Sequence, residues 1–103
     1  MQYNYSIKIG DKKLYKQYAN KIHSFNSIYI GDPTNIHHII YPIYVLCIEE
    51  VNGEEKIVAK IDISISKTTV NEKVLIGAAF SEIQYAPDIN LTSYQKKEEF
   101  VVP

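Results

Sequence analysis

Residues 39–66, IIYPIYVLCIEEVNGEEKIVAKIDISIS, decide the fold of this chain. Asn52 and Gly53 lie between two long apolar runs, and Asn-Gly in that place is typical of a β-hairpin because both turn positions take a positive φ. A third run of strand-forming residues follows. The sequence therefore predicts an antiparallel meander of three segments, 39–50, 55–66 and 73–85.

The register of the first hairpin has two alternatives. A two-residue turn places Ile48 opposite Ile57. It leaves Ile43, Val45 and Cys47 on the second face of the hairpin, whereas a three-residue loop shifts the pairing by one residue and moves them to the apolar face. In both registers the first segment has apolar residues on each face while the second is apolar only at its odd positions, so another element must cover part of the first segment.

The flanking segments complete the expected architecture. Asp11 suits the N-cap of a helix whose apolar side carries Leu14, Tyr18 and Ile22 at intervals of four residues. The small residues at 77–79 are interpreted as a place where that helix packs closely against the strand. The remaining expected elements are a strand at 2–9, the helix at 12–24, a short strand at 27–31, one helical turn at 33–38 and a partly docked, partly mobile tail at 87–103.

These elements predict a single α+β domain over residues 1–103. A chain of 103 residues holds one compact core and no second domain. Its centre is expected to be an antiparallel sheet of four or five strands built on the 39–85 meander, with helix 12–24 packed on one face.

The charged residues narrow the choice of partners. Eleven lysines and no arginine stand against twelve acidic residues, which gives a net charge of −1 and argues against an overall polycationic nucleic-acid or membrane binder. Without guanidinium groups the chain lacks the bidentate contacts that read guanine edges. The bias toward Ile, Tyr and Lys is the one that AT-rich codons produce, and it indicates a virus or mobile element of an AT-rich host.

Cysteine use and hydropathy indicate a cytoplasmic location. Cys47 is the only cysteine, so it makes no internal disulfide, whereas secreted domains of this size rely on several. The N-terminal residues alternate between polar and apolar, unlike a signal peptide. No apolar stretch approaches the roughly 18 residues that span a bilayer, so we expect no membrane partner.

No group of residues predicts an enzyme, a cofactor site or a metal site. The histidines His23, His37 and His38 lack the spacing of zinc ligands, because adjacent residues point in different directions. Cys47 has apolar neighbours, and burial disfavours its thiolate. We therefore expect no catalytic residue, no metal and no cofactor. A small enzyme using His37 or His38 is the least favoured hypothesis, because it needs those rings in a cleft beside an acid.

Two surfaces remain as candidate binding sites. The first is the exposed side of the predicted helix, which carries Lys12, Lys13, Tyr15 and Lys16. Up to Gly31 the chain has five lysines and one aspartate, a balance of +4, while the remaining residues have six lysines and eleven acids, a balance of −5. This side therefore suits an acidic partner.

The second surface is the apolar stripe of Ile43 and Val45 that the two-residue register leaves exposed. Contiguous exposed apolar side chains usually mark an interface with a protein partner or a second copy of the chain. The covering of this stripe by the N-terminal strand or the tail is the other interpretation.

The sequence thus favours a non-enzymatic protein-interaction module, an accessory or inhibitory protein. Its predicted partner-binding residues are Lys12, Tyr15, Lys16, Ile43 and Val45. Its partner is another protein or, in a homodimer, a second copy of the chain. The alternative hypothesis is a weak single-stranded nucleic-acid-binding protein that uses the N-terminal lysines and tyrosines, with an affinity that depends steeply on ionic strength.

Overall fold

The computed structural model describes residues 5–18, 24–34 and 37–103, and most of them belong to an antiparallel sheet of six strands. The strands are β2 (Ser27–Ile30), β3 (His38–Val51), β4 (Glu54–Val70), β5 (Lys73–Phe80), β6 (Gln84–Tyr85) and β7 (Gln95–Lys97). They follow the order β5-β4-β3-β2-β7, and β6 pairs with β4 beyond the end of β5. A second sheet pairs β1 (Ser6–Lys8) with β8 (Glu99–Val101), and the one helix in the described ranges is α1 (Lys12–Gln17).

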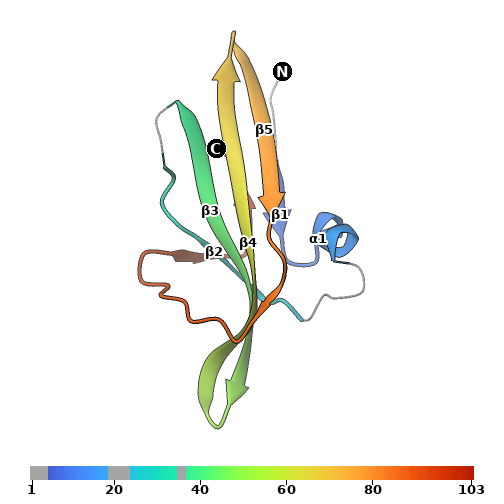
Figure 1. Ribbon diagram of the computed structural model, residues 1–103, viewed down its shortest axis with the longest axis vertical. Helices are drawn as coiled ribbons and strands as arrows, with labels where there is room; N and C mark the ends of the chain where they lie inside the picture. The colour runs from blue at the N-terminus through green and yellow to red at the C-terminus, as the bar shows by residue number, and fades with distance from the viewer. Residues whose placement is uncertain (1–4, 19–23, 35–36) are drawn as a thin grey trace.

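The expected meander is the centre of the structure. Strands β3, β4 and β5 are joined by two turns that lie at opposite ends of the long axis of the molecule (Figure 1). Both central residues of each turn have a positive φ, which is 53° at Asn52, 82° at Gly53, 50° at Asn71 and 65° at Glu72. The Asn-Gly prediction is confirmed, whereas the second turn has Glu72 at a position that favours glycine.

The β3–β4 pairing combines the two registers that the sequence allows. Near the turn Ile48 lies opposite Ile57, as a two-residue turn requires. The register then shifts, and farther from the turn Val45 lies opposite Ile61. This irregularity is a β-bulge in which Val58 is the extra residue of β4. Most of the hairpin therefore has the register of the three-residue alternative.

The bulge places the apolar residues of β3 and β4 on one face of the sheet. Strands β1 and β8 and helix α1 cover this face through Ile7, Leu14 and Val102. Tyr41 of β3 and Phe100 of β8 have ring centroids 5.1 Å apart, which connects the two sheets. The buried core consists of Ile7, Leu14, Tyr18, Ile28, Ile30, Tyr41, Ile43, Val45, Ile61, Ile63, Ile65 and Val102.

Ile43 and Val45 are core residues and do not form an exposed stripe. Their side chains are 2% and 0% exposed. The expected stripe rests on the two-residue register, and it is wrong because the bulge turns both side chains toward Ile61 and Ile63. These two positions offer no accessible side chain to a partner.

The C-terminal segment covers the opposite face of β3. Because β6 lies beside β4 and β7 lies beside β2, residues 86–94 cross the sheet between its two edges (Figure 1). On this path the rings of Tyr94 and Tyr44 stack with centroids 4.8 Å apart, and Leu46 is 0% exposed. A Cβ at Gly31 would lie 2.8 Å from the Tyr94 ring, so the close approach requires glycine. The expectation that another element covers β3 is confirmed, and the segment that begins at 86 supplies it.

Helix α1 begins at Lys12, as the sequence predicts. Within the described residues its last helical residue is Gln17, before the predicted end at residue 24. Asp11 is the N-cap, and its carboxylate accepts a hydrogen bond from the Lys13 N–H at 2.9 Å. Of the predicted helix at 12–24, only Lys12–Gln17 is helical in the described residues. Positions 19–23 lie outside the described residues.

Tyr18, the residue at which α1 ends, contacts residues that are distant in sequence. The backbone of Tyr18 leaves the helical region, with a φ of −127°. Its hydroxyl donates to the Ser81 carbonyl, and its ring centroid lies 6.4 Å from that of Phe80. These contacts draw Tyr18 toward the edge of the sheet instead of along the helix axis.

The predicted helical turn at 33–38 is wrong where the residues are described. Thr34 forms an isolated antiparallel bridge with Ile40, and His38 begins β3, while residues 35–36 lie outside the described ranges. The small residues at 77–79 are exposed on β5 and form no packing spot under α1.

The α+β prediction is therefore matched only in part. The described residues are mostly antiparallel sheet with very little helix. The main sheet has six strands instead of four or five, because the C-terminal segment adds β6 and β7 to it.

Glu72→Gly is expected to stabilise the protein by about 1 kcal/mol, because glycine adopts the left-handed backbone of this turn without the steric cost of a Cβ. Gly53→Ala is the matched control and is expected to destabilise the protein, because alanine at this positive φ adds backbone strain. No atom lies within 4 Å of the Cβ position, so steric contact adds nothing to this effect. Urea titrations of both variants give the free energy of unfolding. A Glu72→Gly variant no more stable than the wild type would show that Glu72 does not strain the turn.

Candidate functional site

The exposed side of α1 brings together three residues that the sequence indicates. Lys12, Tyr15 and Lys16 stand at positions i, i+3 and i+4 of one helix and share a face. All three are exposed, and Tyr15 is 52% exposed. The other side of α1 is anchored in the core by Leu14 and followed by the buried Tyr18. The sequence-based prediction of these three residues as one surface thus agrees with their placement.

Lys13 differs from the other lysines of α1. Its Nζ donates a hydrogen bond to the Ser6 carbonyl at 3.0 Å and lies 4.0 Å from the centroid of the Tyr5 ring. These contacts connect α1 to β1 and the segment before it. Lys13 therefore contributes to the fold, while Lys12 and Lys16 flank Tyr15.

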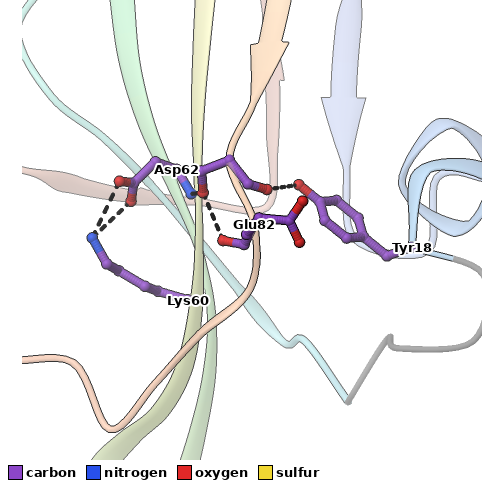
Figure 2. Close-up of polar contacts among 5 residues, drawn as sticks. Tyr18, Lys60, Asp62 and Glu82 are labelled. Atoms are coloured by element: carbon purple, nitrogen blue, oxygen red, sulfur yellow. Dashed lines mark hydrogen bonds and ion pairs between the residues drawn. The ribbon is translucent and has the colours of Figure 1, made fainter.

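Ser81 connects Tyr18, which follows α1, to Asp62 of β4; Figure 2 labels Tyr18 and Asp62. Its N–H donates to the Asp62 carbonyl at 2.9 Å, and the Asp62 N–H donates to the Ser81 hydroxyl at 2.9 Å. The Ser81 carbonyl accepts the Tyr18 hydroxyl. Burial raises the pKa of Tyr18, and the Glu82 and Asp62 carboxylates raise it further, so Tyr18 remains a neutral donor at neutral pH.

A second polar group lies on the face that the C-terminal segment covers. Lys60 Nζ donates to both carboxylate oxygens of Asp62 (Figure 2). The two distances are 2.9 Å and 3.2 Å, and the Lys60 side chain is 13% exposed. The same Nζ lies 5.0 Å from the centroid of Tyr44, whose ring stacks on Tyr94. Burial raises the pKa of Tyr94, and a hydrogen bond with Tyr44 adds to this effect. The group holds Tyr94, and with it the crossing segment, against the sheet.

Sequence reasoning missed this group. The available signal was a lysine and an aspartate two positions apart in β4, because residues i and i+2 of a strand share a face. The tyrosine partners come from β3 and from the crossing segment, and no local pattern predicts that they meet there.

The histidines are on the surface where they are described. His37 and His38 are exposed, and Nδ1 of His38 shares a hydrogen bond with the Thr68 hydroxyl. His23 lies outside the described residues. Within the described ranges, no group of three or more His, Cys, Asp or Glu side chains is arranged to hold a metal ion.

Cys47 is a buried thiol. Its side chain is 1% exposed, and its Sγ lies 3.9 Å from Glu49 Oε1. Burial raises the pKa of the Cys47 thiol, and the Glu49 carboxylate raises it further. A buried neutral thiol is a poor nucleophile, which agrees with the interpretation of Cys47 as a small apolar residue.

The described residues form several hollows, and one of about 320 Å³ is lined by Ile40, Ser64, Ser66 and residues 77–79. An open groove of about 600 Å³ lies at the turn end of the β4–β5 hairpin, beside the C-terminal residues Val102 and Pro103. A cavity of about 60 Å³ lies between α1 and the sheet and is lined by Leu14, Tyr15 and Ile61 among others. The cavity is far below the few hundred Å³ that a drug-sized ligand needs.

Comparisons with models of protein families, with curated proteins and with solved structures found no match. In the described ranges, no helix has the length and apolar character needed to cross a membrane. The surfaces of this chain are therefore the basis for inferring its function.

We expect the free energy of unfolding to fall as the pH rises through and above 10. The pKa values of Tyr18 and Tyr94 are raised above 10.0 in the folded state, so the unfolded chain loses these protons first. The stability that the two neutral hydroxyls contribute is complete below pH 10 and is lost as the pH passes the folded pKa values. Urea titrations at about pH 9 and about pH 11 measure this change.

Tyr94→Phe, which cannot ionise, should show a smaller alkaline loss of stability than the wild type. The Tyr18→Phe/Tyr94→Phe variant should reduce the loss further. If the wild type, Tyr94→Phe and the double variant lost the same free energy of unfolding at alkaline pH, ionisation of these two tyrosines would not be its cause.

Proposed function

We propose that this chain is a non-enzymatic protein-interaction module that binds an acidic surface of a partner protein through Lys12, Tyr15 and Lys16. The observation that carries the proposal is Tyr15, an aromatic side chain that is 52% exposed between two exposed lysines on one helical face. Tyrosine is enriched in protein interfaces because it buries a large ring and keeps a polar tip. The flanking ammonium groups favour carboxylates on the partner.

The position of α1 supports this proposal. Asp11 caps its first turn, Leu14 is 5% exposed in the core, and Tyr18 donates to the Ser81 carbonyl. A surface held in place in this way loses little conformational freedom on binding, and such preorganisation favours affinity. The +4 balance of the chain up to Gly31 adds a longer-range attraction for an acidic partner.

Composition supports the biological setting that we propose. The absence of arginine and the bias toward Ile, Tyr and Lys fit an accessory or inhibitory protein of a virus or mobile element in an AT-rich host. The free, buried thiol of Cys47 fits a reducing compartment, and we place the protein in the cytoplasm on that basis.

Tyr15→Ala and the Lys12→Ala/Lys16→Ala variant are expected to weaken capture of the partner by about tenfold or more, because each removes the centre or the charge of the contact surface. The tagged protein is immobilised and incubated with a lysate of the source cells, and captured proteins are quantified by mass spectrometry. Tyr85→Ala is the matched control, since Tyr85 is 61% exposed on β6, and it should retain capture. Thermal unfolding verifies that all variants fold. A captured set that is the same for wild type and both α1 variants would remove this surface from consideration.

The alternative is a weak single-stranded nucleic-acid-binding protein. Its support is the placement of lysine beside tyrosine on α1, where the exposed Lys12 and Lys16 flank Tyr15. Bases stack on such rings while ammonium groups contact phosphates.

Ionic strength separates the two functions. If the alternative holds, the affinity for a labelled single-stranded oligonucleotide should fall by about tenfold or more between roughly 50 mM and roughly 200 mM salt, as fluorescence anisotropy would record. An oligonucleotide that does not bind at the lower salt concentration would exclude the alternative.

A further inference from the structure

In the part of the chain that the structure describes, the far edge of β5 is an open strand edge. β5 is the last strand of the main sheet, and β4 pairs with it on one side only. β6 pairs with a different part of β4, at Ala59 and Lys60, and so does not cover β5. Among the described residues no strand pairs with the other side of β5.

The hairpin geometry determines which backbone groups this edge presents. Val70 and Lys73 flank a two-residue turn, so they form a hydrogen-bonded pair and the odd residues of β5 direct their N–H and C=O groups toward β4. The Ser81 N–H, which donates to the Asp62 carbonyl of β4, continues the same alternation. The even residues therefore direct their backbone groups away from the sheet, namely Val74, Ile76, Ala78 and Phe80.

The two edges of the main sheet differ in how well they are protected against pairing with a strand of another chain. β7 has three residues, Gln95–Lys97, and its two lysines are exposed, which opposes pairing with another chain. β5 has eight residues and no charge after Lys73. Leu75 on this strand is 55% exposed. A long apolar edge without such protection is the kind that accepts another strand.

The residues of β5 are complementary to a second copy of themselves. In an antiparallel pair across a two-fold axis, outward-directed residues pair only with outward-directed residues. An axis at Gly77 places Val74 opposite Phe80 of the second copy and Ile76 opposite Ala78 of the second copy. All four outward-directed residues are then paired, whereas a shift of the axis by one residue leaves one of them without an outward-directed partner in the strand.

Side chains agree with this register. On the other face Leu75 lies opposite Ala79 of the second copy, which combines a large residue with a small one. Gly77 meets its own copy at the axis, where the absence of a side chain permits close approach. No charged residue of 74–80 meets its own copy, so the pair is free of the like-charge repulsion that a two-fold axis imposes on charged edges.

We propose that a second copy of this chain adds its β5 antiparallel to this β5, so that the two main sheets become one continuous sheet across a two-fold axis. This proposal does not depend on the α1 surface. A strand pair of this length buries less than the roughly 1,200 Å² of a standard interface, so the dimer is expected to be weak, with a dissociation constant on the order of micromolar.

Ala78→Pro and Leu75→Lys test the edge. Proline removes an outward N–H that β4 does not use, and lysine places a charge on the exposed apolar side chain of the edge. Sedimentation velocity from about 5 μM to about 500 μM should show a concentration-dependent monomer–dimer equilibrium for the wild type, and each variant should raise the dissociation constant by about tenfold or more. The matched control is Gln95→Lys on β7, because Gln95 is exposed and β7 forms the opposite edge of the main sheet; this variant should dimerise like the wild type.

A second measurement keeps the proposal testable if Ala78→Pro fails to fold. Hydrogen exchange of the wild type should show slower exchange of the Ile76 and Ala78 amides at high protein concentration, because pairing protects outward N–H groups. A wild type that is monomeric at every concentration would overturn the proposal. It would also be overturned by a dimer that Leu75→Lys leaves unchanged or whose Ile76 and Ala78 amides gain no protection, since another surface would then form the contact.

Discussion

The β-bulge at Val58 is the constraint on which the rest of the structure depends. Side chains alternate along a strand, so a change of register by one residue turns every later residue of the pair to the other face. Near the turn Ile48 pairs with Ile57, and after the bulge Val45 pairs with Ile61. The shift aligns the apolar residues of β3 with the odd, apolar positions of β4. This alignment creates the single face that β1, β8 and α1 cover.

The same bulge explains the course of the C-terminal segment. It leaves Tyr44 and Leu46 on the second face of β3, where apolar surface would otherwise face water. The chain crosses from β6 to β7 over this face, and Tyr94 stacks on Tyr44 while Lys60 pairs with Asp62 beside them. The remaining C-terminal residues then return to the N-terminus in the β1–β8 sheet. Both faces of the long hairpin are thus covered by segments distant from it in sequence.

The surfaces that remain available are those the core does not use. The α1 face was predictable because Lys12, Tyr15 and Lys16 follow the helical spacing in a short stretch behind a cap, and their exposure depends on little more than the burial of Leu14 on the other side. The burial of Val45 was not predictable in the same way, because it depends on a register that no local pattern settles. The open edge of β5 is likewise visible only once the strand order is known.

The sequence by itself determined the elements that local physical chemistry controls. These are the meander, the Asn-Gly turn, the helix cap at Asp11, the basic and aromatic α1 face and the apolar character of Cys47. The tertiary structure decided the rest: the position of the bulge, the end of α1 at Tyr18, the crossing of the C-terminal segment and the edge that stays open. Each of these depends on contacts between residues far apart in the chain, as the bond of Tyr18 to Ser81 does, and their energy exists only when the sheet has assembled.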